Sequence, residues 1–448
     1  MAGNVVIQTA AGSDIVSFST AILSSIKSAK FTAKIVTIIG NNGDKFTVKG
    51  TFNYADPANP SFAGFLGGTA TGATLTDGAV VYATMTGFSV DAVAAVGALL
   101  GVDVNAFLAT FGSIKYIGND GADIGTGLSA DDDLSGGLGD DDLKGSDGDD
   151  IIEGGAGADT LSGGRDIDTL SYKNSSAAVK VSLTGTAKGG DAAGDTFVGF
   201  ENLTGSAFND KLTGTNNVNI LDGGAGNDIL RGLGGADELL GGSGTDTADY
   251  TGSNAGVTVN LEADTASGGH AQGDVLESIE NLTGSSFNDT LTGDNLANVL
   301  KGGAGNDVLD GGVNADKLDG GGGNDRLIGG QSVDTLFGRG GADTFVLSNL
   351  ASSADKIRDF AAGVDSLEID AALFGGGLTG GVALAAGQVE VNGTGLASTG
   401  AVRFILNSNT GELFFDVNGS GGGATGSRLI ATLDGTLGGF SSSDFDIV

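Results

Sequence analysis

Residues 302–328 read GGAGNDVLD, GGVNADKLD and GGGGNDRLI in succession, which is one nine-residue pattern written three times. In each copy aspartate is sixth and leucine is eighth. Glycine adopts positive φ at low cost and leaves backbone carbonyls uncovered, so the first six residues of each unit predict a turn. The last three predict a short strand whose eighth residue points into a narrow core, because side chains alternate along a strand.

The same period of nine runs through much of the chain. Units begin at 118, 127, 136, 145, 154 and 163, then at 205, 214, 223, 232 and 241, and then at 284, 293, 302, 311, 320, 329 and 338. The sixth residue is Asp except at Asn219 and Asn298, and the eighth is Leu, Ile or Phe except at Gly125 and Ala248. Two units would make one coil, so that each turn stacks on the turn 18 residues away. The predicted fold is all-β, a right-handed parallel β-roll of nonapeptide repeats.

Two inserts, 172–204 and 250–283, interrupt the period and are copies of each other. Each ends in Asn-Leu-Thr, at 202–204 and at 281–283, and is followed by Gly-Ser at the start of the next unit. A duplicated insert is expected to be a modified structural coil and not a catalytic centre.

The flanking regions differ in composition from the repeats. Residues 1–116 contain strand-like runs and an amphipathic stretch at 90–111, which predict a small β-rich domain with a helical cap and of unknown role. Residues 117–346 would form the β-roll. Residues 347–448 hold further strand-like runs, at 402–406 and 412–416, and predict a C-terminal β-rich region.

The stacked turns predict multiple calcium sites. Calcium takes about six to eight oxygen ligands and accepts both carboxylate and carbonyl oxygen. The predicted carboxylate ligands are Asp123, Asp132, Asp141, Asp150, Asp159, Asp168, Asp210, Asp228, Asp237, Asp246, Asp289, Asp307, Asp316, Asp325, Asp334 and Asp343. The glycines expected to contribute to the turns and their carbonyl ligands are Gly136, Gly154, Gly157, Gly223, Gly226, Gly302, Gly305, Gly320 and Gly323.

Aspartates one coil apart are expected to face the same ion. The foremost pairs are Asp141 with Asp159, Asp150 with Asp168, Asp228 with Asp246, Asp307 with Asp325, Asp316 with Asp334 and Asp325 with Asp343. Weaker or empty sites are expected where Asn219 and Asn298 replace the carboxylate. The same is expected where Asp166, Asn314 and Ser332 replace the fourth-position glycine.

The repeats resemble the RTX, or haemolysin-type calcium-binding, family. The region from Gly341 through 355–367 is similar to the part that ends serralysin-type proteases, although no protease module precedes the repeats. This resemblance implies a bacterial protein that a type I secretion apparatus exports by an uncleaved C-terminal signal, to which Asp446-Ile447-Val448 is similar. The chain is therefore expected outside the cell or on its surface, and to fold there when calcium binds.

Charge excludes some partners. The formal net charge is −35, from 56 acidic and 21 basic residues, and no Lys or Arg cluster suited to nucleic acid is present.

Residues 1–14 lack the features of a Sec signal peptide, and no apolar stretch is long enough to predict a transmembrane segment. Cysteine is absent from the sequence.

The chain lacks the residues that most kinds of catalysis require. The one histidine, His270, lies in the second insert at the position that Asp191 occupies in the first. No Gly-x-Ser-x-Gly motif or cysteine nucleophile is present. Paired carboxylates of a glycosidase stay possible, but residues 1–116 contain no Glu and no Trp. The chain is predicted not to be an enzyme.

Three functions fit these observations. The first is a calcium-stiffened structural or surface protein of the S-layer, matrix or adhesin kind, which binds cell-surface polysaccharide or copies of itself. The alternative is a glycan-active enzyme or toxin-like effector carried by an RTX secretion module. A third is a soluble calcium-binding effector whose partner the sequence does not identify.

Overall fold

The computed structural model describes strands at 5–8, 32–39, 45–53 and 83–86, and then residues 115–118, 120–347, 354–418 and 427–448. The chain divides into two compact units, Met1–Asp210 and Lys211–Val448. This division falls inside the repeats, and the predicted domain boundaries at 116 and 346 stay predictions. The predicted helical cap at 90–111 lies outside the described residues.

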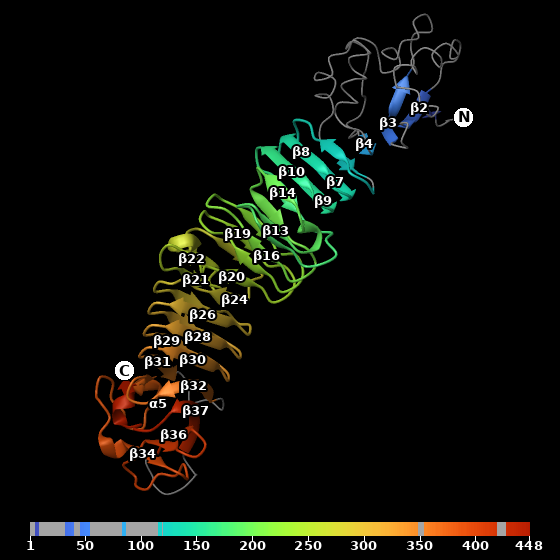
Figure 1. Ribbon diagram of the computed structural model, residues 1–448. Helices are drawn as coiled ribbons and strands as arrows, with labels where there is room; N and C mark the ends of the chain where they lie inside the picture. Colours follow the sequence, from blue (N-terminus) through green and yellow to red (C-terminus); the bar gives the residue numbers. More distant parts are fainter. Residues whose placement is uncertain are drawn as a thin grey trace, which may run out of the picture. The chain divides into compact units, whose positions relative to one another are not determined.

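Among the described residues of the first unit, two ladders of strands lie beside a separate hairpin that belongs to the first insert (Figure 1). One runs, in sheet order, through β1 (Val5–Gln8), β2 (Thr32–Ile39), β3 (Lys45–Asn53), β4 (Ala83–Thr86), β5 (Lys115–Ile117), β7 (Asp133–Leu138), β9 (Ile151–Ala156), β11 (Thr169–Ser171) and β15 (Asn202–Thr204). The other runs through β14 (Thr196–Val198), β10 (Thr160–Arg165), β8 (Asp142–Asp147) and β6 (Ile124–Thr126). From β4 onward every pairing within these ladders is parallel.

The second unit continues the nonapeptide pattern in three ladders. The longest runs through β16 (Lys211–Thr213), β18 (Ile229–Arg231), β20 (Thr247–Asp249), β24 (Asn281–Thr283), β26 (Val299–Ala304), β28 (Lys317–Gly322), β30 (Thr335–Gly340), β32 (Asp355–Ala361), β37 (Ser427–Thr436), β36 (Glu412–Asp416), β35 (Phe404–Asn407) and β34 (Val389–Asn392). The next runs through β22 (Thr265–Ser267), β21 (Thr258–Asn260), β25 (Thr290–Thr292), β27 (Val308–Asp310), β29 (Arg326–Ile328), β31 (Thr344–Leu347), β33 (Ser366–Ile369) and β38 (Phe445–Ile447). The short third one holds β17 (Ile220–Asp222), β19 (Glu238–Leu240) and β23 (Val275–Glu277).

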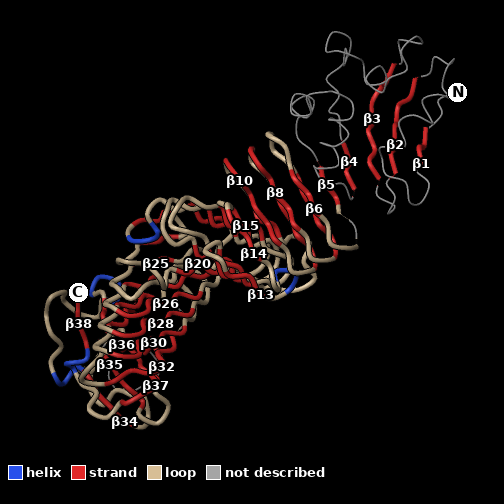
Figure 2. The backbone as a smooth tube through the Cα atoms, turned by 45° about the horizontal axis from the view of Figure 1, so that its top comes forward, coloured by secondary structure: helices blue, strands red, loops and turns tan. Residues whose placement is uncertain are grey.

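The strand register aligns the eighth-position leucines, as the period predicts. Leu309 pairs with Leu327 and Leu300 with Leu318, each one coil apart, and all four are fully buried. Figure 2 shows β26, β28 and β30 as neighbouring strands, one after another. Each buried leucine contributes about 1.5–3 kcal/mol relative to an exposed one. The structure thus confirms an all-β parallel β-roll of nonapeptide repeats.

One exception to the leucine pattern has a packing cause. Gly125 stands at an eighth position, and a Cβ there would overlap the ring of Tyr116 and the side chain of Leu143. Tyr116 is 1% exposed, so its ring fills the core space that a leucine would otherwise take.

The two inserts have the same succession of structural elements. Each begins with an antiparallel hairpin, β12 (Lys180–Ser182) with β13 (Thr186–Lys188) in the first and β21 with β22 in the second. A single 3₁₀ turn follows, at Gly190–Ala192 and at Gly269–Ala271. Two strands then pair in parallel with the preceding coil, β14 and β15 in the first insert and β23 and β24 in the second. Each insert is therefore a modified coil.

The C-terminal region is β-rich, as predicted. β32 pairs with β30, and β33 pairs with β31, so the region continues both long ladders of the second unit. Its core is aromatic: Phe404 contacts Phe415 and Phe445, with ring centroids 5.0 and 4.4 Å apart. Among the described residues, no helix has the length and apolar character to span a membrane.

Candidate metal-binding turns

The sixth-position aspartates form a hydrogen-bonded ladder along the roll. The backbone N–H of Asp307 donates to Oδ1 of Asp325 at 2.9 Å, and that of Asp325 donates to Oδ1 of Asp343 at 2.9 Å. All six foremost predicted pairs are brought together in this way, at 2.7 to 2.9 Å. One oxygen of each carboxylate therefore holds the preceding coil in place.

The other oxygen of many of these carboxylates has no donor. Oδ2 is buried without a hydrogen-bond partner in Asp141, Asp150, Asp159, Asp168, Asp237, Asp246, Asp307, Asp316, Asp325 and Asp334. These side chains are at most 3% exposed. A buried carboxylate oxygen without a partner is costly, because it loses its hydration and gains nothing in return. Such oxygens call for a cation or a proton.

The unpartnered oxygen faces the first glycine of its own unit. A Cβ on Gly302 would overlap Oδ2 of Asp307 and the carbonyl oxygen of Gly320, one coil later. Gly136 is placed in the same way against Asp141 and the carbonyl of Gly154. Glycine is therefore required at the first position, because a side chain would fill a cradle lined by oxygen atoms.

The remaining predicted glycines are first or fourth in their units. First-position Gly154, Gly223 and Gly320 face the Oδ2 of their own aspartate. Fourth-position glycines bring the backbone against the preceding coil. A Cβ on Gly157, Gly305 or Gly323 would overlap a peptide group there, whereas Gly226 donates its N–H to the Ser243 carbonyl of the following coil at 2.8 Å.

The donor set fits calcium. It combines carboxylate oxygen with backbone carbonyl oxygen, and calcium accepts both. In the part of the chain that the structure describes, no three side chains among His, Cys, Asp and Glu converge on one point. An ion bound in these turns would thus take one or two carboxylates and complete its shell with carbonyls.

Burial raises the pKa of the ladder carboxylates. Desolvation first, and then the negative charge of neighbouring aspartates, raise the pKa of Asp150, Asp307 and Asp316 to about 7, and that of Asp141 to about 6. Without a cation, these groups would bind protons at a higher pH than ordinary aspartates do. A bound cation would favour the charged form.

Two predicted ligands have both oxygens occupied by the protein. Oδ2 of Asp289 accepts from Ser285 N at 2.5 Å, and its Oδ1 accepts from Val257 N at 2.7 Å and from Ser285 Oγ at 2.9 Å. Asp210 has the same bonds to Ser206 and Val179. In these two units the backbone N–H and the hydroxyl of the second-position serine occupy the carboxylate oxygens. Ser146 is also at the second position but has positive φ, and Oδ2 of Asp150 in its unit has no partner.

Four other predicted ligands have hydrogen bonds of their own in the ladder or within their turn. Oδ2 of Asp132 accepts from Leu128 N at 2.5 Å. Asp123, 7% exposed, donates its N–H to Asp141. Asp228 and Asp343 are members of the ladder, in which Asp228 N donates to Asp246 and Asp343 Oδ1 accepts from Asp325 N.

The two asparagine turns are closed by their own amides. Asn298 Nδ2 donates to the Glu280 carbonyl at 2.7 Å, and Asn298 Oδ1 accepts from Asp294 N at 2.8 Å. Asn219 Oδ1 accepts from Thr215 N at 2.6 Å. An amide group brings N–H donors and no charge to a place where an ion needs lone pairs. The expectation that these turns bind weakly stays a prediction.

The residues that replace the fourth-position glycine keep a positive φ in the turn. Asp166, Asn314 and Ser332 have φ of 76°, 75° and 91°, in the left-handed region that glycine occupies elsewhere. The aspartates of these three units still have an unpartnered Oδ2. The geometry thus gives no reason for weaker binding there, and that prediction too stays open.

Sequence reasoning missed several carboxylates that act as sixth-position residues. Asp195, Glu201, Asp274 and Glu280 in the inserts, and Asp355 and Asp365 beyond the repeats, each accept a backbone N–H from a sixth-position aspartate. A signal existed, because each is followed two residues later by an apolar residue on a strand, as in Asp195-Thr196-Phe197.

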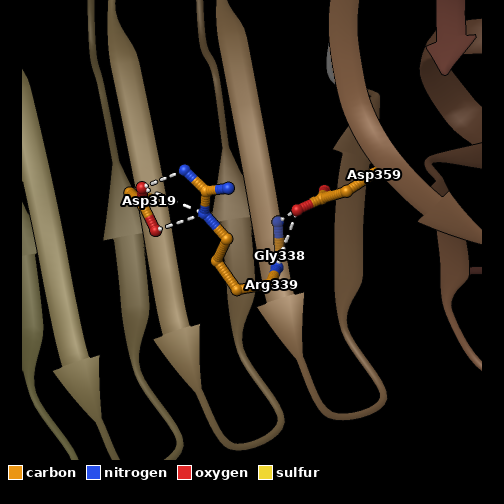
Figure 3. Close-up of polar contacts among 4 residues, drawn as sticks. All are labelled: Asp319, Gly338, Arg339 and Asp359. Atoms are coloured by element: carbon orange, nitrogen blue, oxygen red, sulfur yellow. Dashed lines mark hydrogen bonds and ion pairs between the residues drawn. The ribbon is translucent and has the colours of Figure 1, made fainter. Parts of the chain in front are cut away.

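Asp359 closes the C-terminal end of the repeats (Figure 3). Its carboxylate accepts the backbone N–H groups of Gly338 and Arg339, both at 3.0 Å. The Arg339 guanidinium turns back to Asp319 at 2.8 Å and lies over the ring of Phe337. These contacts fix the last repeat turn against β32.

Comparison with known families supports this interpretation. The model of the RTX calcium-binding nonapeptide repeat, which describes four copies, matches residues 135–170, 195–230, 213–248, 283–318 and 310–345. A search of curated proteins finds no match. The roll of this chain is therefore built from RTX-type calcium-binding nonapeptide repeats.

Proposed function

We propose that the chain is a secreted structural protein of a bacterial surface or matrix, whose roll folds when calcium binds outside the cell. The observation that carries the proposal is the stack of buried aspartates, in which one oxygen holds the next coil and the other has no partner. We assign the calcium ligands to the sixth-position aspartates with an unpartnered Oδ2 and to the glycine carbonyls beside them.

The residues of each turn divide the work. Oδ1 of Asp325 keeps the coil that contains Asp307 in register, and the leucine ladder buries the core beneath. Oδ2 of Asp307 and the Gly320 carbonyl line the cradle at Gly302. Bound calcium supplies positive charge between carboxylates that otherwise repel one another. Because calcium binds the folded form, it stabilises that form by mass action.

Secretion is part of the same proposal. RTX repeats are typical of secreted bacterial proteins, and the acidic, apolar C-terminal residues resemble a type I secretion signal. A chain whose folding depends on calcium would stay unfolded in a cytosol with little free calcium, and an unfolded chain can pass through a narrow channel. Calcium outside the cell would then start folding.

Repetition favours a structural role over catalysis. The carboxylates of the roll recur turn after turn in one arrangement, whereas an active site is a unique constellation. The backbone N–H of His270 donates to Ser253 Oγ at 2.9 Å, and that of Asp191 makes the same bond to Ser175. The insert turn thus keeps its structure with either side chain, which supports a structural role for this position too.

The test is a calcium titration of EGTA-treated protein, with circular dichroism and light scattering recorded together. We expect β structure to appear with calcium, and magnesium at the same concentration to serve as the unresponsive control. No gain of β structure would overturn the proposal. Calcium-dependent sheets or filaments in electron micrographs would support the surface role, whereas turnover of a polysaccharide panel would favour a glycan-active enzyme.

A further inference from the structure

Each insert closes one turn of the aspartate ladder with a glutamate. Oε2 of Glu201 accepts the backbone N–H of Asp168 at 3.1 Å, and Oε2 of Glu280 accepts that of Asp246 at 2.7 Å. Asp168 and Asp246 also accept, through their carbonyls, the N–H groups of the glutamates at 3.1 and 3.2 Å. The same arrangement occurs once in each compact unit.

An oxygen-lined cradle lies beside each glutamate turn. Asp168 and Asp246 are fully buried, and Oδ2 of each has no hydrogen-bond partner. A Cβ on Gly163 would overlap the Gly199 carbonyl oxygen and lie 2.6 Å from Oδ2 of Asp168.

The second insert repeats this cradle with other residues. A Cβ on Gly241 would overlap the Ser278 carbonyl oxygen and lie 2.8 Å from Oδ2 of Asp246. Gly199 and Ser278 thus supply the carbonyl that first-position glycines supply in the regular turns.

The length of the turn explains the change from aspartate to glutamate. In a regular unit the residue whose carbonyl lines the cradle and the residue with the carboxylate are five positions apart, as are Gly163 and Asp168. In the first insert they are only two residues apart, at Gly199 and Glu201. A shorter turn places the backbone differently, and one additional methylene lets the carboxylate still reach the N–H of Asp168. Gly199 and Ser278 both have positive φ, 72° and 56°, so the two shortened turns share one backbone form.

We propose that insert residues complete the calcium sites of Asp168 and Asp246, the first with Glu201 and the Gly199 carbonyl, the second with Glu280 and the Ser278 carbonyl. These sites use a glutamate in place of the aspartate that the nonapeptide pattern requires. They make the inserts binding coils and not spacers between binding coils. This inference rests on calcium binding by the regular turns, as proposed above.

The experiment counts bound calcium per full-length chain by equilibrium dialysis. Glu201→Gln and Glu280→Gln each keep a side-chain oxygen that accepts the backbone N–H, so the ladder is retained while one charge is lost. We expect each single variant to bind one ion fewer than the wild type, and the double variant two fewer. The matched control, Glu262→Gln with Glu277→Gln, removes two exposed charges of the second insert and is expected to bind the wild-type number.

The outcomes separate the two proposals. A wild-type chain that binds no calcium would overturn the proposed function. A double variant that binds as many ions as the wild type, with an unchanged circular dichroism spectrum in calcium, would overturn the insert sites alone. If the double variant does not fold, the single variants decide, since each leaves the other insert intact.

Discussion

The turns of Asp289 and Asp307 lie one coil apart and belong to the same ladder of hydrogen bonds. They differ in whether the second carboxylate oxygen, Oδ2, has a hydrogen-bond donor. Asp289 N donates to Asp307 at 2.8 Å, just as Asp307 N donates to Asp325 at 2.9 Å. Yet Oδ2 of Asp289 accepts from Ser285, whereas Oδ2 of Asp307 has no partner. Stacking of coils and binding of a cation are therefore separate properties of the repeat. The first needs an aspartate, and the second also needs positive φ at the second position, which Gly303 has in the unit of Asp307.

The largest expected effect is that of pH on the calcium-free chain, because it sums over all turns of the Asp307 kind. An unfolded aspartate titrates near pH 4, whereas burial raises the pKa of Asp150, Asp307 and Asp316 to about 7 in the fold. The folded state holds more protons between these values, so its free energy of unfolding in EGTA should fall as pH rises from about 4 to about 7. Circular dichroism in EGTA across this range measures the effect, as β structure that is present at low pH and lost toward neutral pH.

Saturating calcium provides the control for that effect. A cation keeps the carboxylates charged in the fold, so the fall with rising pH should disappear. The same loss of β structure with and without calcium would show that these carboxylates are not ligands.

Removal of a core leucine should affect both kinds of turn equally. Leu291 and Leu309 are paired in register and fully buried, one in the unit of Asp289 and one in the unit of Asp307. Alanine at either position should lower the free energy of unfolding by about 2–5 kcal/mol, in calcium, by denaturant titration. A much smaller loss at Leu291 would mean that the two turns differ in their core as well.

Asp307→Asn should have effects of opposite sign with and without calcium. In calcium the variant should bind one ion fewer and lose about 1–3 kcal/mol of stability, because a charged ligand is gone. In EGTA above pH 7 it should keep more β structure than the wild type, because a neutral amide replaces a buried carboxyl that ionises there. Asp289→Asn is the matched control and should bind as many ions as the wild type in the same dialysis experiment.

Ser285→Gly should convert one kind of turn into the other, with the smallest effect. It removes the hydroxyl that bonds to Asp289 and allows residue 285 the positive φ of Gly303, in whose unit the Oδ2 of Asp307 receives no backbone N–H. We expect a loss of about 1 kcal/mol in EGTA and a gain of one calcium ion per chain. An unchanged ion count would show that the serine hydroxyl does not block the site.

The sequence predicts the repeating part of this structure because the repeat dictates its own register. A period of nine places Leu309 beside Leu327 and Asp307 beside Asp325 without reference to the rest of the chain. The division of work between the two carboxylate oxygens is not predictable in this way. It depends on which donors lie within reach, as Ser285 does for Asp289.

The role of the inserts and the exceptions to the leucine pattern could not be predicted from the sequence. Glu201 does not match the aspartate pattern, and its role follows from a shortened turn that the sequence shows only as a missing stretch of residues. Gly125 breaks the leucine pattern because the ring of Tyr116, from outside the repeats, occupies its place. Both cases depend on contacts between segments that follow different rules.

The aspartate ladder also has a mechanical consequence within the second unit. Each carboxylate ties its coil to one neighbouring coil, 18 residues away, so the strength of the stack resides in a series of short links. Under tension from one end, such a stack should yield one coil at a time, as repeat proteins with nearest-neighbour contacts do. Each step would release about 60 Å of extended chain. Calcium concentration would then set the force of every step, so the same chain would be tough in one medium and soft in another.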